Sequence, residues 1–417
     1  MFTPIHRALG IEACAITAEL LDLCIEKRIE EADDLDWKQV LPPDAGGGRK
    51  DWAEEFAKDV AAMAYSGGGW LVYGMGERLV DGRASASALH PVTWTDKAEQ
   101  QLRTAAFSRV APSITGLQFH PVPIRGGFVV LLHVPNSPGR PFLARVGTDA
   151  FRAPFRNGAH TFYLDEREIE RAYANRFQQR REWDEDLDRL FAETADASDR
   201  HVVACAVASA RPKESLRTLQ EFDQARAFEI IEDARRSRLH DGSAVALPWN
   251  PVYRPGLRRW VVMDGNSKYM ARLTLHFDGS VTATARMGLT TPQLQDHPYD
   301  FIGSVVERFV ADTVVLVSAH RRILGLPCDY GLRFGLVGKE GVPLIVRATD
   351  VQTHLPFEAD HSIPFLRCVP IDADLSPAAD SDEAWEVSTR VSQDLINQGG
   401  IRGVALGRRA ATAGSTS

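Results

Sequence analysis

Arginine side chains between Lys97 and His160 supply the first chemistry that this sequence could support. The stretch holds eight Lys or Arg residues against two Asp or Glu residues, a formal charge of +6. A guanidinium group can hold a phosphate through two parallel hydrogen bonds, so a group of arginines favours a polyanionic ligand. The arginines are Arg103, Arg109, Arg125, Arg140, Arg145, Arg152 and Arg156.

Two of these arginines alternate with aromatic residues. Phe151 precedes Arg152 and Phe155 precedes Arg156, so the rings could stack on bases while the guanidinium groups hold a nucleic-acid backbone. The alternative is that both phenylalanines lie in the core and that the arginines belong to a solvated face. The residue types alone leave both interpretations open.

A run of three glycines, Gly67, Gly68 and Gly69, follows an apolar helix pattern and precedes the apolar run at 70–73. Glycine permits positive φ and close packing, which suits a helix end and a tight turn. Such clusters can also present backbone N–H groups to a phosphate, so both roles stay open. The loop is not a P-loop, because the Gly-Lys-Ser/Thr ending is absent.

Other chemistries have little support in the sequence. No Cys-x-x-Cys occurs, and His320, Cys328 and His354 lack the spacing of metal ligands. No Gly-x-Ser-x-Gly element indicates a serine hydrolase. An odd number of scattered cysteines suits reduced thiols in a reducing compartment. They are Cys14, Cys24, Cys205, Cys328 and Cys368.

The elements that must position the first-half residues alternate between helix and strand. Apolar side chains recur at helical spacing over 20–29, 52–63 and 96–107, and a further helix opens at Asp165 as N-cap and runs through Phe177. Asp36 and Lys38 share one face of a short predicted strand. The predicted strands are 35–38, 70–73, 117–124, 127–134 and 142–146.

The second half has an α+β pattern. Helices are predicted at 216–239, around Phe301 and around Trp385, and a hairpin is predicted at Asp278-Gly279. The predicted strands are 259–264, 268–277, 281–286, 332–337 and 342–346. We therefore expect domains at 1–180 and 201–400, a solvated helical connector at 181–200 and a disordered tail at 401–417.

Length and charge set the broad class. A chain of 417 residues exceeds what one hydrophobic core usually serves, so we expect two domains. The net charge of -8 excludes a histone-like protein that coats nucleic acid through its overall charge. The sequence shows no apolar run long enough to cross a membrane and no secretory signal, so we expect a cytoplasmic protein without a membrane partner.

Three segments in order resemble the bacterial AlbA-type DNA-binding domain of the Schlafen family. Residues 31–38 are similar to its Glu-Ser-x-x-x-Glu-Phe-Lys signature, and residues 56–75 are similar to its helix, Gly-Gly and strand ending in Gly-Val. The third segment is the strand at 128–135 with Arg140-Pro141, followed by Arg156-Asn157-Gly158. The resemblance covers about residues 15–178 and implies an α/β (α+β) AlbA-like domain with a mixed sheet and flanking helices, beside a separate α+β domain.

The resemblance also implies site residues. Some Schlafen proteins are metal-dependent RNases, and the matching acidic positions here are Glu31, Asp36 and Glu77, which would hold Mg²⁺ or Mn²⁺, with Lys38 beside them. This chain departs from the family pattern, because Asp36 is shorter than the usual glutamate and Gly76 stands where a carboxylate is expected. Lys38 could equally form a surface ion pair with Asp36.

We therefore expect a protein that binds DNA or RNA, with a regulatory or defence role and no cofactor required for binding. The expected contacts are Lys38, Gly67, Gly68, Gly69, Arg145, Arg152, Arg156 and Asn157. One alternative is a metal-dependent endoribonuclease that uses Glu31, Asp36 and Glu77. Another is a protein-interaction module without nucleic-acid affinity. A paired-lobe groove would require a homodimer, since the motifs occur once.

Overall fold

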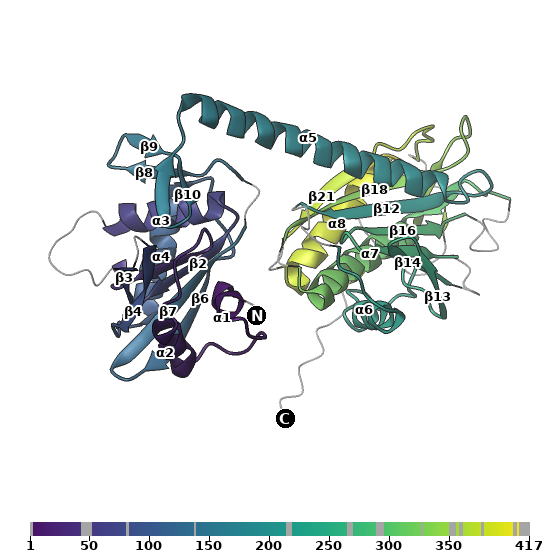
Figure 1. Ribbon diagram of the computed structural model, residues 1–417. Coiled ribbons are helices and arrows are strands. Elements are labelled where there is room, and N and C mark those ends of the chain that lie inside the picture. Colours follow the sequence, from purple (N-terminus) through teal and green to yellow (C-terminus); the bar gives the residue numbers. More distant parts are fainter. Residues whose placement is uncertain are drawn as a thin grey trace. The chain divides into compact units, whose positions relative to one another are not determined.

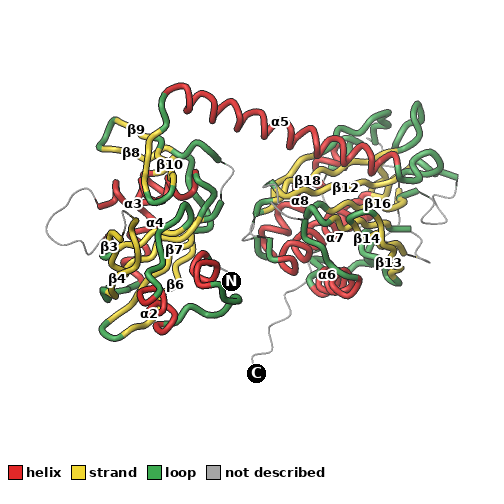
Figure 2. The backbone as a smooth tube through the Cα atoms, in the orientation of Figure 1, coloured by secondary structure: helices red, strands yellow, loops and turns green. Residues whose placement is uncertain are grey.

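The computed structural model describes residues 3–42, 52–80, 83–136, 139–213, 219–264, 270–288, 296–326, 328–349, 356–357, 362–376, 379–402 and 407. The chain divides into two compact units, Met1–Arg180 and Arg181–Ser417 (Figure 1). Both units mix helices and strands, as the sequence predicts (Figure 2). His354, the first residues of the 216–239 helix and most of the 401–417 tail lie outside the described residues.

A mixed four-stranded sheet forms the centre of the first unit, in the order β1-β2-β7-β6. β1 (Leu35–Lys38) runs parallel to β2 (Gly69–Tyr73). β2 pairs antiparallel with β7 (Gly127–Val134), which pairs antiparallel with β6 (Gln118–Ile124). The predicted ends of all four strands agree with the observed ends to within one residue, because their apolar runs are bounded by glycines and turns.

Each face of this sheet has its own apolar core, because successive side chains of a strand point to opposite faces. Leu71 and Tyr73 of β2 pack in a cluster with residues of α3 (Trp52–Tyr65) and α4 (Asp96–Arg109). Trp70 and Val72 pack on the other side, in a cluster with residues of α1 (Pro4–Leu9) and α2 (Ala18–Glu26). The helices therefore cover both faces of the sheet.

Short strands complete the first unit. β3 (Met75–Val80) pairs with β4 (Arg83–Leu89). β8 (Leu143–Val146) lies between β5 (Val110–Ala111) and β9 (Ala150–Arg152). β10 (Pro154–Asn157) and β11 (His160–Tyr163) form a two-stranded hairpin. Of these, the sequence analysis predicts only β8, since the sequences of the others, such as RASASAL in β4, lack a continuous apolar run.

A seven-stranded antiparallel sheet forms the centre of the second unit. Its spatial order is β13 (Pro251–Gly256), β14 (Arg259–Asp264), β15 (Arg272–His276), β16 (Val281–Arg286), β12 (Cys205–Pro212), β18 (Tyr330–Val337) and β21 (Ile371–Leu375). A small sheet joins β17 (Asp300–Ile302), β19 (Ile345–Thr349) and β20 (Pro356–Phe357). The first strand in sequence, β12, therefore lies inside the large sheet.

Helices pack on both faces of the large sheet. Leu332 and Phe334 of β18 belong to the same buried cluster as residues of α6 (Gln224–Arg236), α7 (Gly303–Leu324) and α8 (Ser381–Asn397). On the opposite face, Gly331 lies under the Trp183 ring of α5 (Glu166–Asp196), and a Cβ there would overlap the ring.

α5 differs from the expected connector. Asp165 caps it as predicted, because its Oδ1 accepts a hydrogen bond from the Glu168 N–H at 2.8 Å. The helix then continues without a break to Asp196, and Leu187 in the expected 181–200 connector is buried. That stretch is therefore a packed part of the second unit and not a fully solvated link. Among the described residues, no helix combines the length and the apolarity that crossing a membrane would need.

Candidate nucleic-acid interface

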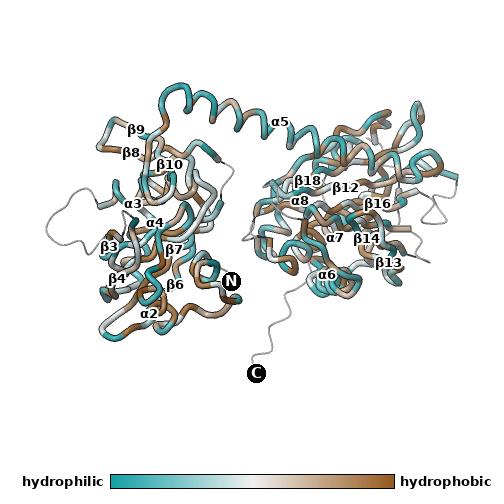
Figure 3. The backbone as a smooth tube through the Cα atoms, viewed as in Figure 1, coloured by the Kyte–Doolittle hydropathy of each residue, from teal (hydrophilic) through white to brown (hydrophobic). Residues whose placement is uncertain are grey.

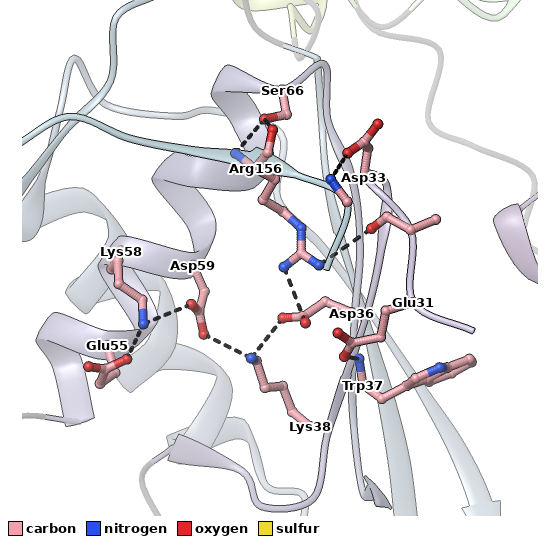
Figure 4. Close-up of polar contacts among 12 residues, drawn as sticks. Glu31, Asp33, Asp36, Trp37, Lys38, Glu55, Lys58, Asp59, Ser66 and Arg156 are labelled. Carbon is pink, nitrogen blue, oxygen red and sulfur yellow. Dashed lines mark hydrogen bonds and ion pairs between the residues drawn. The ribbon is translucent and has the colours of Figure 1, made fainter. Parts of the chain in front are cut away.

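A cluster of charged side chains joins the first motif to the rest of the first unit (Figure 4). Because Asp36 and Lys38 share a face of β1, their side chains meet: Lys38 Nζ lies 2.9 Å from Asp36 Oδ2. Lys38 Nζ also lies 3.6 Å from Asp59 Oδ2 of α3. Arg156 of β10 completes the cluster, with its guanidinium 3.1 Å from Asp36 Oδ1. We call these four residues the buried charge cluster.

The electrostatics of this cluster follow from burial and pairing. Burial alone would raise the pKa of Asp36, but the positive charges of Lys38 and Arg156 outweigh it and lower that pKa. Burial opposes the charge of Lys38, yet Asp59 and Asp36 raise its pKa overall. Burial is the largest influence on Asp59 and raises its pKa. Asp36 is thus a buried carboxylate held ionised by two cations.

Glu31 lies beside the cluster and behaves differently. Its Oε1 accepts a hydrogen bond from the Trp37 backbone N–H at 2.8 Å. Burial, followed by the negative charge of Asp36, raises the pKa of Glu31 to about 8, and the charge of Glu77 adds to this. Burial and the charge of Asp36 thus both favour the protonated form of Glu31.

These carboxyl groups do not fit a metal site as they are arranged. Both oxygens of Asp36 face cations, so Lys38 and Arg156 would have to move before Asp36 could coordinate a metal ion. A side chain at Gly76, where the family pattern has a carboxylate, would collide with His90. Across the part of the chain that the structure describes, no group of three or more His, Cys, Asp and Glu is placed to hold a metal ion. The geometry therefore gives the nuclease alternative no support.

Arg156 lies where a phosphate cannot reach it. Its side chain is 2% exposed, in contrast to the surface contact expected from the sequence. The Arg156 N–H donates to Ser66 Oγ at 2.8 Å, and Ser66 Oγ donates to the Arg156 carbonyl at 3.2 Å. The neighbouring Gly158 N–H donates to the Asp33 carboxylate. The segment from Arg156 to Gly158 therefore anchors β10 to the first motif, and Asn157 between them is exposed.

The three glycines form a closely packed turn. Gly67, Gly68 and Gly69 have φ values of 110°, 81° and 157°. The Gly67 and Gly68 N–H groups donate to carbonyls of α3, which ends the helix. A Cβ at Gly68 would lie 2.5 Å from the backbone nitrogen of Asn136. Of the two roles left open by the sequence, this geometry favours the helix end and turn, since two of the three N–H groups are already used.

Exposed arginines and aromatic rings gather on the two hairpins that follow. Arg145 of β8 lies over the Phe151 ring at 5.3 Å, and Arg152 of β9 lies over the Tyr163 ring at 5.2 Å. These rings and that of Phe162 remain 44% to 48% exposed. In the described residues, neither Arg145 nor Arg152 has a carboxylate partner. Phe151 and Arg152 are consecutive in β9 and therefore point to opposite faces of that hairpin, so the two ring contacts form two separate patches. We call the set Arg145, Phe151, Arg152, Phe162 and Tyr163, over both patches, the hairpin surface.

The remaining arginines of the basic stretch do not join one surface. Arg103 pairs with Glu99 at 2.8 Å, and Arg109 pairs with Glu54 at 3.3 Å. Arg140 lies over the Tyr65 ring and donates to Asn136. Of the phenylalanine pair, Phe151 is exposed, whereas Phe155 is half-buried with its ring 6.0 Å from that of Tyr65. Arg103 and Arg109 are thus paired with acids and Phe155 lies partly in the core, as the alternative interpretation predicts. Phe151, in contrast, is exposed, as the base-stacking interpretation requires.

Sequence analysis missed three residues of these sites. Asp59 was not singled out, although it lies one turn beyond Glu55 in the helix that faces β1. Phe162 and Tyr163 were also missed. The signal that could have located them is the Asn157-Gly158 pair, because Asn-Gly between two short β-type runs indicates a hairpin.

The fold and the motif at its first strand define a mixed α/β domain, and comparison identifies its family. The Schlafen, AlbA_2 family pattern matches residues 31–165. Residues 31–165 therefore match the family that the sequence motifs predict.

Other comparisons add little. The solution NMR structure of the N-terminal domain of a putative ATP-dependent DNA helicase RecG-related protein from Nitrosomonas europaea is 17% identical, with a TM-score of 0.25. The match covers 32% of this chain and 84% of that one. At that score the likeness supports no inference about this chain. No curated protein matches the sequence.

Proposed function

We propose that the first unit binds nucleic acid through the hairpin surface. The observation that carries this proposal is the pair of exposed guanidinium groups, Arg145 and Arg152, each beside an exposed ring and without a carboxylate to neutralise it in the described structure. Unpaired guanidinium groups attract phosphates, and exposed rings stack on bases. Membership of the AlbA_2 family agrees with this role, because the family resemblance implies DNA binding.

The buried charge cluster has a positioning role in this proposal. It ties β10 to β1 and α3, and β10 pairs with β11, which carries Phe162 and Tyr163. Asp36 and Arg156, both buried, therefore hold the hairpin in place and do not touch the ligand, and Lys38 supports them through its pair with Asp36. Binding requires no metal or other cofactor, since guanidinium groups and rings are sufficient for it.

The test is fluorescence anisotropy of labelled DNA and RNA with the full chain over a series of salt concentrations. Wild type is expected to bind with an affinity that falls as salt rises. The double variant R145A/R152A is expected to bind more weakly and to lose about 1.4 from the slope of log affinity against log salt on a single strand.

The matched control is R83A/R103A, which removes the same charge from the same unit. These guanidinium groups are already paired with Glu30 and Glu99. The control is expected to bind like wild type. Undetectable binding by wild type, or equal loss in both double variants, would refute the proposal and leave the protein-interaction alternative.

A further inference from the structure

Helix α5 consists of two stretches with different charge patterns. The part that belongs to the second unit, 181–196, holds two arginines and seven Asp or Glu residues, and Arg189 pairs with Asp186 while Asp188 pairs with Arg333 of β18. From Arg171 to Arg180, by contrast, the sequence RAYANRFQQR contains three arginines and no Asp or Glu. This cationic segment lies wholly in the first unit and begins eight residues after Tyr163 of β11.

The arginines of the cationic segment are not neutralised. Arg171 and Arg180 are exposed and Arg176 is half-buried. Within the described residues none of the three has a carboxylate partner. Arg176 and Arg180 are four residues apart, a spacing at which like charges repel on a helix. The segment therefore concentrates positive charge instead of dispersing it, and Figure 3 shows α5 as largely hydrophilic.

Aromatic rings share one face of the helix with Arg176 and Arg180, whereas Arg171 lies on the opposite side. Tyr173, Arg176, Phe177 and Arg180 are spaced by three, one and three residues, which places them on one side of an α-helix. The Phe177 side chain is 57% exposed. Further along the same face, Trp183 and Phe191 cover glycines of β18.

We propose that the cationic segment of α5 is a second nucleic-acid contact and that it receives an unpaired strand. This inference rests on the proposed function of the first unit, nucleic-acid binding, and adds a contact outside the hairpin surface. From Tyr173 to Arg180 this face spans about 10 Å, long enough for about two phosphates of one strand. An exposed ring between guanidinium groups matches a strand whose bases are free to stack, and a duplex offers no such free base faces.

The experiment measures anisotropy with the full chain and labelled single-stranded DNA, single-stranded RNA and the duplex of the same sequence. The triple variant R171A/R176A/R180A keeps helix propensity and is expected to lose about 1.4 from the salt slope on single strands, through the two arginines on that face. The variant R171K/R176K/R180K is expected to keep that slope. Phe177→Leu is expected to weaken single-strand binding by roughly fivefold or more with the slope unchanged.

The matched control is R189A/R226A/R236A, which removes the same charge. These arginines pair with Asp186, Glu229 and Asp233 in the second unit, and the control should bind like wild type. Circular dichroism at each salt concentration checks that every variant is folded.

The outcomes separate the two proposals. If R145A/R152A binds weakly while R171A/R176A/R180A binds like wild type, the inference fails and the hairpin surface stands. If only the α5 variant is weakened, the inference stands and the hairpin surface is refuted. Preference of wild type for the duplex overturns the assignment to an unpaired strand, and absence of all binding overturns both proposals.

Discussion

Replacing Arg156 by methionine tests whether the first unit depends on the buried charge cluster. Both Arg156 and Asp36 have side chains at most 3% exposed, so the variant leaves Asp36 without one of its two cations. Breaking a buried pair by removing one partner costs about 3 to 5 kcal/mol. Lys38 still lies 2.9 Å from Asp36, which places the cost at the lower end, about 3 kcal/mol. Methionine fills most of the space of the arginine stem, so little apolar burial is lost.

Amide hydrogen exchange on the full chain measures this loss locally. Peptides that cover β1 and β2 should open about 150-fold more often in Arg156→Met than in wild type, which corresponds to about 3 kcal/mol. The double variant D36N/R156M should recover part of the protection, because it also removes the carboxylate that has lost one of its two cations.

Arg83→Met is the matched control. Its guanidinium pairs with Glu30 at 2.9 Å, but the side chain is 72% exposed, and exposed pairs contribute about 1 kcal/mol or less. Exchange in Arg156→Met that equals exchange in Arg83→Met would refute the buried pair, and with it the positioning role of β10.

Three further predictions concern stability. Glu31 has a pKa of about 8 when folded and 4.5 as a free group, so the folded state loses stability as pH rises through that window. Glu31→Gln removes this loss, so the melting temperature of the variant relative to that of wild type should rise as pH increases from 4.5 to about 8. Parallel profiles of melting temperature against pH would contradict this. Gly68→Ala should cost about 2 kcal/mol or more, because φ is 81° and the Cβ meets backbone, whereas Gly147→Ala, with φ of 61° and open space, should cost less; urea titration would compare them. Gly331→Ala should lower stability by about 1 to 3 kcal/mol, because the new methyl group forces the Trp183 ring away from β18. Amide hydrogen exchange in β18 measures this, and an unchanged rate would argue against that packing.

The central elements of the first unit could be predicted from sequence because each has a strong local pattern. The run at 70–73 is apolar at every position and follows three glycines, which defines β2. The four-residue spacing of apolar side chains from Trp52 onward defines α3 in the same way.

β12 shows where local pattern fails. Its sequence CAVASARP holds three alanines and only one β-branched residue, so it has low strand propensity, yet nearly all of it is buried. Its position is set by pairing with β16 and β18, which come later in the chain. Tertiary packing decides such an element, and no local window contains that information.

Arg156 was placed on the surface by sequence reasoning for a related reason. A strand alternates its faces, so Phe155 and Arg156 must point to opposite sides, but the sequence does not say which side is covered. Burial of an arginine requires a carboxylate partner, and here that partner is Asp36 on a distant strand. The exposed status of Arg145 and Arg152 was, in contrast, consistent with their short hairpin strands.

The internal position of β12 has a consequence for synthesis of the chain. β12 is made first among the strands of its sheet, but its two neighbours are β16 and β18, and the latter ends at Val337. At ordinary translation speeds of about 5 to 20 residues per second, both edges of β12 stay unpaired for on the order of ten seconds. A nascent strand in that state is open to pairing with other chains. The alanine-rich composition of β12 gives it a low strand propensity, which is why its sequence does not predict a strand. The same low propensity makes it a poor nucleus for aggregation until the later strands of the sheet have been synthesised.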